Sequence, residues 1–385
     1  MRLATAACYA LGLAGLTITA AGGASADALA TPAMGPTLSA NPTPIGLDAG
    51  PLGKIYVGGV ASVLGLTQSN ADFGDKSSRG DISNAQVFIQ KTDGQFQFFV
   101  QLGAYSLPAL GGAYVKSGTI VDNTFGPAPV AYAKWAPSSS FNIIAGKLPT
   151  LIGSESIFTF QNNNIERGLL WNQEPVVSKG VQANFTKGPL ALSLSINDGY
   201  YSDRFNWVSG LITWTFNPRD SLTIDGGGNF DHSNKASFAT PLVQNDGELI
   251  NVAFTHAQGP FSITPYFQYT HTPVKTEDFI FHDVSTYGGA VLAKYSFTPK
   301  FNVAARAEYI KSSSSPQAFE SNVLYGPNSK AYSLTLTPTY QFKIFFVRAE
   351  ASYTHIDGLT PSFGFGKDGM ATSQVRGLVE TGVLF

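Results

Sequence analysis

The sequence holds almost no cysteine and no recognisable set of metal ligands. Its single cysteine among 385 residues, Cys8, lies in an apolar segment near the N-terminus. Cysteine-based metal or redox chemistry is therefore excluded from the rest of the chain. None of its five histidines stands in a tight ligand spacing such as H-E-x-x-H. We therefore expect neither a metal nor another cofactor.

Charge is also scarce. Charged residues make up 13% of the chain, against roughly 25% in soluble domains, and the net charge of −2 argues against nucleic acid as a partner. Beyond the N-terminal segment, no apolar run reaches the roughly 18 to 20 residues that a membrane-spanning helix needs. A chain that crosses a bilayer without such helices must close its strands into a barrel, because lipid cannot satisfy unpaired backbone groups.

The N-terminus has the features of an export signal. A positive start at Arg2 leads into an apolar run, which ends at the small-residue sequence Ala24-Ser25-Ala26. This pattern predicts a signal peptide over residues 1–26. Residues 27–50 are rich in Ala, Pro, Thr and Gly and predict a flexible periplasmic linker. The remainder, 51–385, is expected to form the folded domain.

The last eleven residues alternate between an apolar and a mostly polar face, as a strand's side chains do. Val375, Val379, Val383 and the terminal Phe385 share the apolar face. An apolar face of this kind is typical of an outer-membrane barrel strand, whose outside meets lipid. The terminal phenylalanine suits recognition by the barrel-assembly machinery. The alternative is the edge strand of a soluble β-sandwich.

From Leu52 onward the chain divides into about sixteen segments of roughly ten residues, the length that a tilted strand needs to cross a bilayer. Tight turns such as Thr92-Asp93-Gly94 and Lys187-Gly188-Pro189 alternate with longer connections. Short periplasmic turns and long outer loops characterise a transmembrane antiparallel β-barrel. We predict an all-β barrel of about 16 strands, with about 14 to 18 left open. The longest connection, 149–176, is its third outer loop.

Charged side chains of the last strands and the first share the predicted inward face, where they avoid the cost of about 2–4 kcal/mol of facing lipid. Five are basic and three acidic, which predicts a positive wall that lines the pore: Lys54, Lys294, Arg306, Glu308, Arg348, Glu350, Arg376 and Glu380. Because arginine forks suit carboxylates and phosphates, this wall predicts a mild preference for anions. The alternative is that these charges pair with one another inside a packed lumen.

The third outer loop is expected to fold inward and to narrow the pore. Its acidic side chains would then face the basic wall, and the field between them would orient polar solutes. The candidate constriction residues are Glu155, Glu166, Arg167, Trp171 and Glu174.

Other sites remain open as alternatives. Asp231-His232-Ser233 permits a hydrolase at the barrel rim, although residues adjacent in sequence rarely face each other. Asp72, Asp75 and Asp81 would offer carboxylate ligands to calcium, with a solvated loop as the alternative. A closed barrel with a structural or adhesive role is a further alternative. Among these we favour a non-enzymatic channel.

One stretch of the sequence resembles a known family. It comprises Gly146-Lys147-Leu148 with Gly153-Ser154-Glu155, then Asn162-Asn163-Asn164, Gly180-Val181 and Asn197-Asp198-Gly199. These segments are similar to the β-barrel porin-2 (OmpL-like) family. The resemblance implies a water-filled pore for small polar solutes in the lipid bilayer of the Gram-negative outer membrane. It leaves open which solute passes and whether three copies form a homotrimer.

Overall fold

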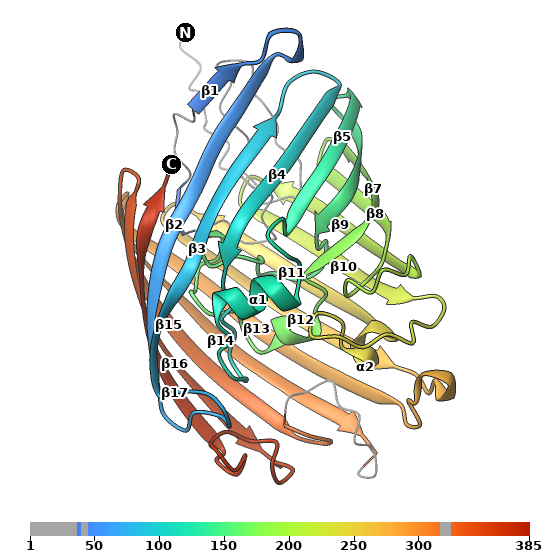
Figure 1. Ribbon diagram of the computed structural model, residues 1–385, viewed down its shortest axis with the longest axis vertical. Coiled ribbons are helices and arrows are strands. Elements are labelled where there is room, and N and C mark those ends of the chain that lie inside the picture. The colour runs from blue at the N-terminus through green and yellow to red at the C-terminus, as the bar shows by residue number, and fades with distance from the viewer. Residues whose placement is uncertain (1–36, 40–44, 316–324) are drawn as a thin grey trace.

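The computed structural model describes residues 37–39, 45–315 and 325–385. Sixteen of the described strands form a closed antiparallel barrel, in which each strand pairs with its neighbours in sequence and β17 pairs with β2 (Figure 1). This confirms the predicted all-β barrel. The strands are β2 (Lys54–Gln68), β3 (Ser78–Lys91), β4 (Phe96–Tyr105), β5 (Val130–Ser138), β6 (Phe141–Pro149), β7 (Val177–Lys187), β8 (Leu190–Asn197), β9 (Trp207–Asn217), β10 (Asp220–Asn229), β11 (Glu248–Gln258), β12 (Phe261–Thr272), β13 (Val284–Thr298), β14 (Phe301–Ser314), β15 (Lys330–Phe342), β16 (Phe345–Asp357) and β17 (Ser373–Leu384).

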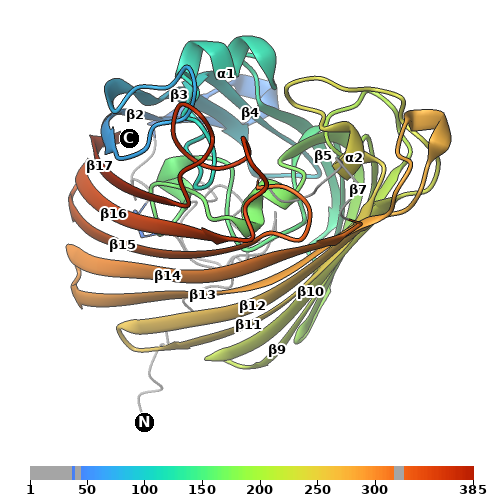
Figure 2. The same cartoon turned by 90° about the horizontal axis from the view of Figure 1, so that it is seen from below.

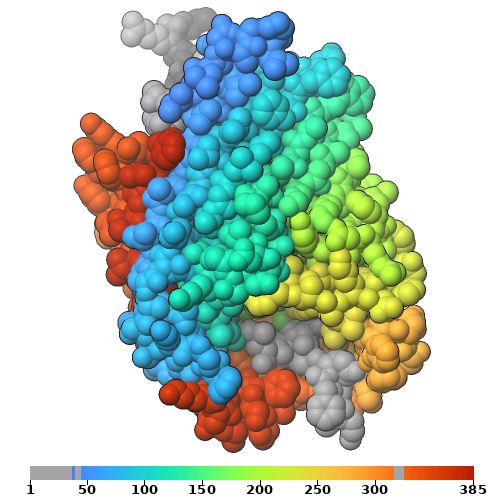
Figure 3. Space-filling view, viewed as in Figure 1, coloured from blue at the N-terminus to red at the C-terminus, as the bar shows by residue number. Residues whose placement is uncertain are grey.

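Most strands place apolar residues outside and mostly polar residues inside; β2 is an exception, because Val60, Leu64 and Leu66 on its inner face are buried in apolar clusters. In β15, Leu334 and Leu336 are 61% and 51% exposed, whereas the alternate residues Thr335 and Thr337 are 1% and 0% exposed. The alternation follows from the period of two along a strand, and an apolar outer face is what lipid requires. Figure 3 shows how closely the first strands of the barrel pack side by side.

The connections alternate in length as predicted. Turns at one end of the barrel are short, whereas the eight connections at the other end are mostly long and form the outer loops, seen from their own side in Figure 2. The helices in these loops are short: α1 (Ser117–Asn123), η2 (Thr159–Gln161), η3 (Leu170–Gln173), α2 (Leu242–Asn245) and η4 (Thr276–Asp278). A further short helix, η1 (Gly50–Leu52), precedes β2. Among the described residues, no helix has both the length and the apolar character needed to span a membrane.

The barrel closes through the last residue of the chain. The backbone N–H of Phe385 donates to the carbonyl of Gly59 on β2 at 3.0 Å, and the N–H of Gly59 donates back at 2.7 Å. A Cβ at Gly59 would lie 2.6 Å from the ring of Phe385, so the close approach of the terminal ring requires glycine here. Recognition of Phe385 by the barrel-assembly machinery stays a prediction.

The signal peptide predicted over 1–26 lies outside the described residues, as does much of the linker predicted over 27–50. The described parts of the linker contact the barrel, which differs from a free lead-in. Strand β1 (Ile45–Asp48) pairs with the start of β2. Farther upstream, Ser39 and the side chain of Gln341 exchange two hydrogen bonds of 2.8 Å. The adjacent Leu38 is buried in an apolar cluster.

Candidate functional site

The third outer loop, residues 150–176 between β6 and β7, folds into the barrel. Nearly all of its residues are buried, and Figure 2 shows its green trace inside the ring of strands. Apolar side chains hold one part of it, because Phe158 packs edge-on against Tyr105, with ring centroids 5.3 Å apart, and Phe160 lies 5.7 Å from Phe88. The inward fold predicted for this loop is confirmed.

The loop lies against a charged wall, which we define as the inward-facing charged side chains of β14, β16 and β17. These are Arg306, Glu308, Arg348, Glu350, Arg376 and Glu380. All six face the lumen, as their parity in the sequence predicts, and all six are buried. Their partners show how the loop is held.

Arg348 binds the loop through its backbone. Its guanidinium group donates to the carbonyl oxygens of Thr159, Asn162 and Asn163 at 2.9, 2.9 and 2.8 Å. It also lies 3.4 Å from a carboxylate oxygen of Glu380. The guanidinium fork offers several donors in one plane, so one side chain can satisfy three carbonyls of a tight loop at once.

The other two arginines of the wall bind loop carboxylates. Arg306 Nη1 lies 2.5 Å from Glu155 and donates to the carbonyl of Glu166 at 2.7 Å, while its Nε pairs with Glu308 at 3.1 Å. Arg376 pairs with the carboxylate of Glu166 at 2.9 Å. Such charge-assisted hydrogen bonds are the strong ones in proteins, and they fix the middle of the loop to β14 and β17.

The glutamates of the wall accept hydrogen bonds from the amides of the same loop. Glu350 accepts from the backbone N–H groups of Ile165 and Glu166 at 2.5 and 2.9 Å. Glu308 accepts from Leu169 and Leu170 at 3.1 and 3.4 Å. Loop carbonyls therefore meet arginines and loop amides meet glutamates, which satisfies backbone groups that would otherwise be buried without a partner.

This arrangement corrects one expectation from the sequence. The acidic residues of the loop were expected to face the basic wall across the constriction, but Glu155 and Glu166 contact Arg306 and Arg376 directly. The physical reason is that buried guanidinium groups need acceptors, and the loop supplies them. The alternative of paired charges therefore describes this part of the lumen.

The two lysines predicted for the wall, Lys294 and Lys54, lie on other strands than its arginines. Lys294 faces inward on β13 and is half-buried, whereas Lys54 is exposed at the very start of β2, away from the wall. Whether any of the predicted residues lines a water-filled pore stays a prediction.

Arg167 is a fully buried cation inside the loop. Within the described structure, none of its guanidinium nitrogens has a hydrogen-bond partner. The group lies 5.1 Å from the ring centre of Trp171, at cation–π distance. Burial lowers the pKa of Arg167 to about 10, although the nearby carboxylates of Glu155 and Glu166 oppose this shift.

Glu174, at the end of the loop, faces the other side of the barrel. Its carboxylate accepts hydrogen bonds from Gln268 at 2.8 Å and from Asn251 at 3.3 Å, and it does not join the arginines of the wall. Burial raises the pKa of Glu174 well above its usual range, and the negative charge of Asp225 adds to this shift. Asp225 was not among the residues predicted from the sequence, although the alternation along β10 places it on the inward face.

Two of the three carboxylates considered for calcium, Asp75 and Asp81, are engaged with the second outer loop. Asp81 accepts hydrogen bonds from the hydroxyl of Tyr114 at 3.0 Å and the backbone N–H of Ser117 at 2.7 Å. Asp75 accepts from the N–H of Tyr114 at 2.9 Å and pairs with Arg79. In the described part of the chain, no group of three or more His, Cys, Asp or Glu side chains is arranged to hold a metal ion.

His232 and Ser233 turn to different partners. Ser233 is buried and accepts hydrogen bonds from the amides of Asn206 and Asn245, whereas His232 Nδ1 lies 3.5 Å from Asp278. Nothing in these contacts couples the hydroxyl to the imidazole, as a nucleophile and its base would require.

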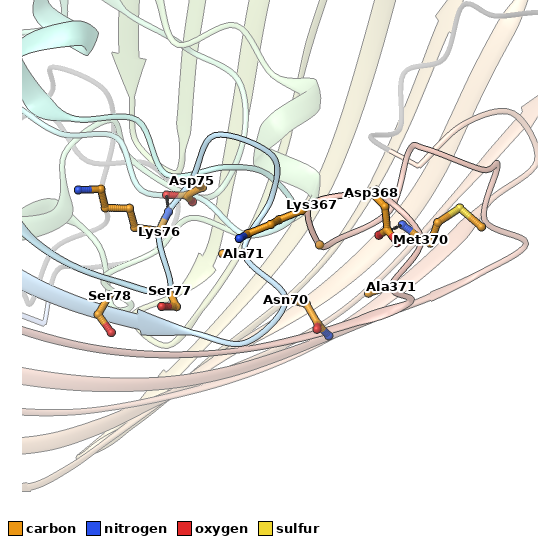
Figure 4. Close-up of a pocket in the computed structure, with 11 residues that line it drawn as sticks. Asn70, Ala71, Asp75, Lys76, Ser77, Ser78, Lys367, Asp368, Met370 and Ala371 are labelled. Atoms are coloured by element: carbon orange, nitrogen blue, oxygen red, sulfur yellow. Dashed lines mark hydrogen bonds between the residues drawn. The ribbon is translucent and has the colours of Figure 1, made fainter.

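A groove of about 1030 Å³ opens at the outer rim between the first loop (69–77) and the eighth (358–372). Figure 4 shows Lys367 extending from the eighth loop toward the first. Asp368 and Lys76 also contribute to its lining, so cations and carboxylates are mixed in the groove.

A closed sixteen-stranded barrel with an apolar outside and an inward-folded third loop defines an outer-membrane porin. Over residues 54–385 the sequence matches the family described as "Putative beta-barrel porin-2, OmpL-like", and the chain belongs to this family. Membership supports a location in the outer membrane of Gram-negative bacteria, within its lipid bilayer.

Solved structures show the same fold at low sequence identity. Outer-membrane expressed OmpT of Vibrio cholerae is 11% identical, with a TM-score of 0.57 over 89% of this chain and 100% of that one. The outer membrane channel DcaP of Acinetobacter baumannii is 11% identical, with a TM-score of 0.57 over 86% of this chain and 97% of that one. A comparison with curated proteins gives no match.

Proposed function

We propose that the protein is a water-filled channel for the passive diffusion of small polar solutes, such as sugars, amino acids or anions. The observation that carries the proposal is the inward-folded third loop inside the barrel of a porin-family member. The inward faces of β6 to β10 support it, because they are rich in uncharged amides and hydroxyls, among them Asn142, Gln182, Ser193 and Thr213.

We propose that selectivity between anions and cations is weak. The predicted wall alone has five basic and three acidic side chains, which led to the expectation of mild anion preference. The loop adds Glu155, Glu166, Glu174 and Arg167, and β10 adds Asp225, so the whole group has six cations and seven carboxylates. The charges that form ion pairs between the wall and the loop largely cancel each other at a distance, and salt screens the remaining ones beyond a Debye length of about 8 Å.

Recording of single channels in planar bilayers tests the proposal. We expect discrete steps of conductance, with a reversal potential near zero across a tenfold gradient of KCl. A strong potential of either sign would contradict weak selectivity, and a consistent absence of channels would contradict the diffusion pore and favour a structural or adhesive barrel.

A rim hydrolase is the remaining alternative, and it is tested separately. The purified protein should release no product from phospholipids or peptides, and Ser233→Ala should change neither this result nor the conductance. Activity that disappears in this variant would contradict the non-enzymatic assignment. Association into a homotrimer is likewise a proposal, which cross-linking in native membranes tests.

A further inference from the structure

A pair of carboxylates at the base of the third loop has only neutral hydrogen-bond donors. Asn251 on β11 donates from one amide nitrogen to both of them, to Glu174 at 3.3 Å and to Asp225 at 3.1 Å. The remaining donors are the amide of Gln268 to Glu174, at 2.8 Å, and the backbone N–H of Gly153 to Asp225, at 3.0 Å. Two buried carboxylates without a cation are costly, because burial removes water that would stabilise their charge.

The other glutamates of this loop show the contrast. Glu155 and Glu166 are each paired with an arginine of the charged wall, at 2.5 and 2.9 Å. The wall lies on β14, β16 and β17, whereas Glu174 and Asp225 meet residues of β10 to β12. Arginines therefore balance the negative charge of the loop on the side of the wall, whereas no cation balances it beside Glu174 and Asp225.

Three oxygen atoms around this pair lack any hydrogen-bond partner among the described residues. They are Oε2 of Glu174, Oδ1 of Asn251 and the hydroxyl of Tyr266, all on residues that are 4% exposed or less. Tyr266 stands two positions before Gln268 on β12, so its side chain leaves the same face of the strand. A proton shared by the two acids would satisfy one acceptor and leave the others unbonded.

We propose that Glu174, Asp225, Asn251 and Tyr266 form a binding site for one calcium ion. Calcium takes six to eight oxygen ligands from carboxylates, amide and backbone carbonyls and water, in a flexible geometry. Two carboxylates supply the charge. The amide of Asn251 turns over, so that its oxygen takes the place from which its nitrogen contacts both acids; this oxygen and the phenol oxygen supply neutral ligands, and water completes the shell. Magnesium is disfavoured, because it demands a nearly ideal octahedron and loses its water reluctantly.

The site would join the two ends of the third loop to the barrel wall. Gly153 lies near the start of the loop and Glu174 near its end, and a Cβ at Gly153 would collide with the Glu174 carboxylate. Gly153, at φ +94°, is therefore a position that glycine alone occupies without strain. Binding of the ion is independent of the proposed diffusion function, and it is measured without any channel recording.

Protein refolded in detergent without lipopolysaccharide tests the proposal, since that lipid itself binds divalent cations. Terbium, a luminescent substitute for calcium, should bind at a saturable site and be excited through Tyr266 and nearby aromatic rings. Calcium should displace it, and Glu174→Gln or Asp225→Asn should weaken binding at least tenfold. Glu277→Gln, which removes an exposed carboxylate from another loop, is the matched control and should leave affinity unchanged.

Two further variants keep the test decisive if those two fail to fold. Tyr266→Phe removes one hydroxyl and should weaken calcium binding several-fold. Asn251→Asp adds a third carboxylate at the site and should strengthen it at least tenfold. The same affinity in the wild type and in all site variants, or no saturable binding by the wild type at pH 8, would overturn the proposal and leave the carboxylates sharing a proton.

Discussion

Replacing Arg348 by alanine should detach part of the third loop from the barrel wall. The change leaves the carbonyls of Thr159, Asn162 and Asn163 without their donor and leaves Glu380 without its cation. Hydrogen bonds to charged groups contribute about 1.5–3 kcal/mol each, but water that enters the lumen will replace part of this loss. Breaking a buried ion pair from one side typically costs about 3–5 kcal/mol, and we expect a loss in this range.

Urea unfolding of protein refolded in detergent measures this loss, and single-channel recording follows the loop. The Arg348→Ala channel should show larger or noisier conductance, because the freed loop can move within the barrel. Arg348→Lys is the matched control: it keeps the charge but lacks the planar fork, so its loss should be intermediate. A loss below about 0.5 kcal/mol for Arg348→Ala, together with unchanged conductance, would refute this explanation of how the loop is held.

Three other predictions concern selectivity, closure and pH. Combining Arg348→Ala with Arg376→Ala removes two lumen cations, so the reversal potential should shift toward cation preference; an unchanged potential would mean that neither charge influences the pore. Gly59→Val should destabilise the barrel and slow its folding, because the new side chain overlaps the ring of Phe385. Gly65→Val is the control, since no atom lies within 4 Å of the added Cβ there. Folding yield and the unfolding midpoint are compared between the two variants. Burial raises the pKa of Asp246 above its ordinary value of 3.8, and the negative charge of Asp278 adds to this shift. The folded state therefore binds the proton more tightly than the unfolded state does. The free energy of unfolding should rise as the pH falls through the folded pKa toward 3.8. Asp246→Asn should reduce that rise in unfolding measurements between pH 7 and 4.5, and equal rises in both proteins would contradict the argument.

The barrel could be predicted from local patterns, whereas the contacts of its loop could not. Parity along β16 and β17 placed Arg348 and Arg376 inside correctly, because alternation is a property of each strand alone. The bonds of Arg348 reach residues up to 189 positions away, and no local pattern encodes such distances. No local pattern showed that Glu174 turns to β11 and β12, so it was grouped with the other loop acids that face the arginines. Leu38 was assigned to a flexible linker, because its partners are also distant in sequence.

The attachment of the third loop also sets an order of events in assembly. The loop is made from residues 150–176, but most of its charged partners lie on β14, β16 and β17, the last part of the chain to be synthesised. Thr159 and Glu380, which share a hydrogen bond of 2.6 Å, are 221 positions apart. Contacts between such distant segments form slowly, since the intervening chain must first be ordered. The third loop therefore becomes fixed in the lumen only as the ring of strands is being completed, and a barrel halted before its final hairpins would lack the side chains that hold this loop in place.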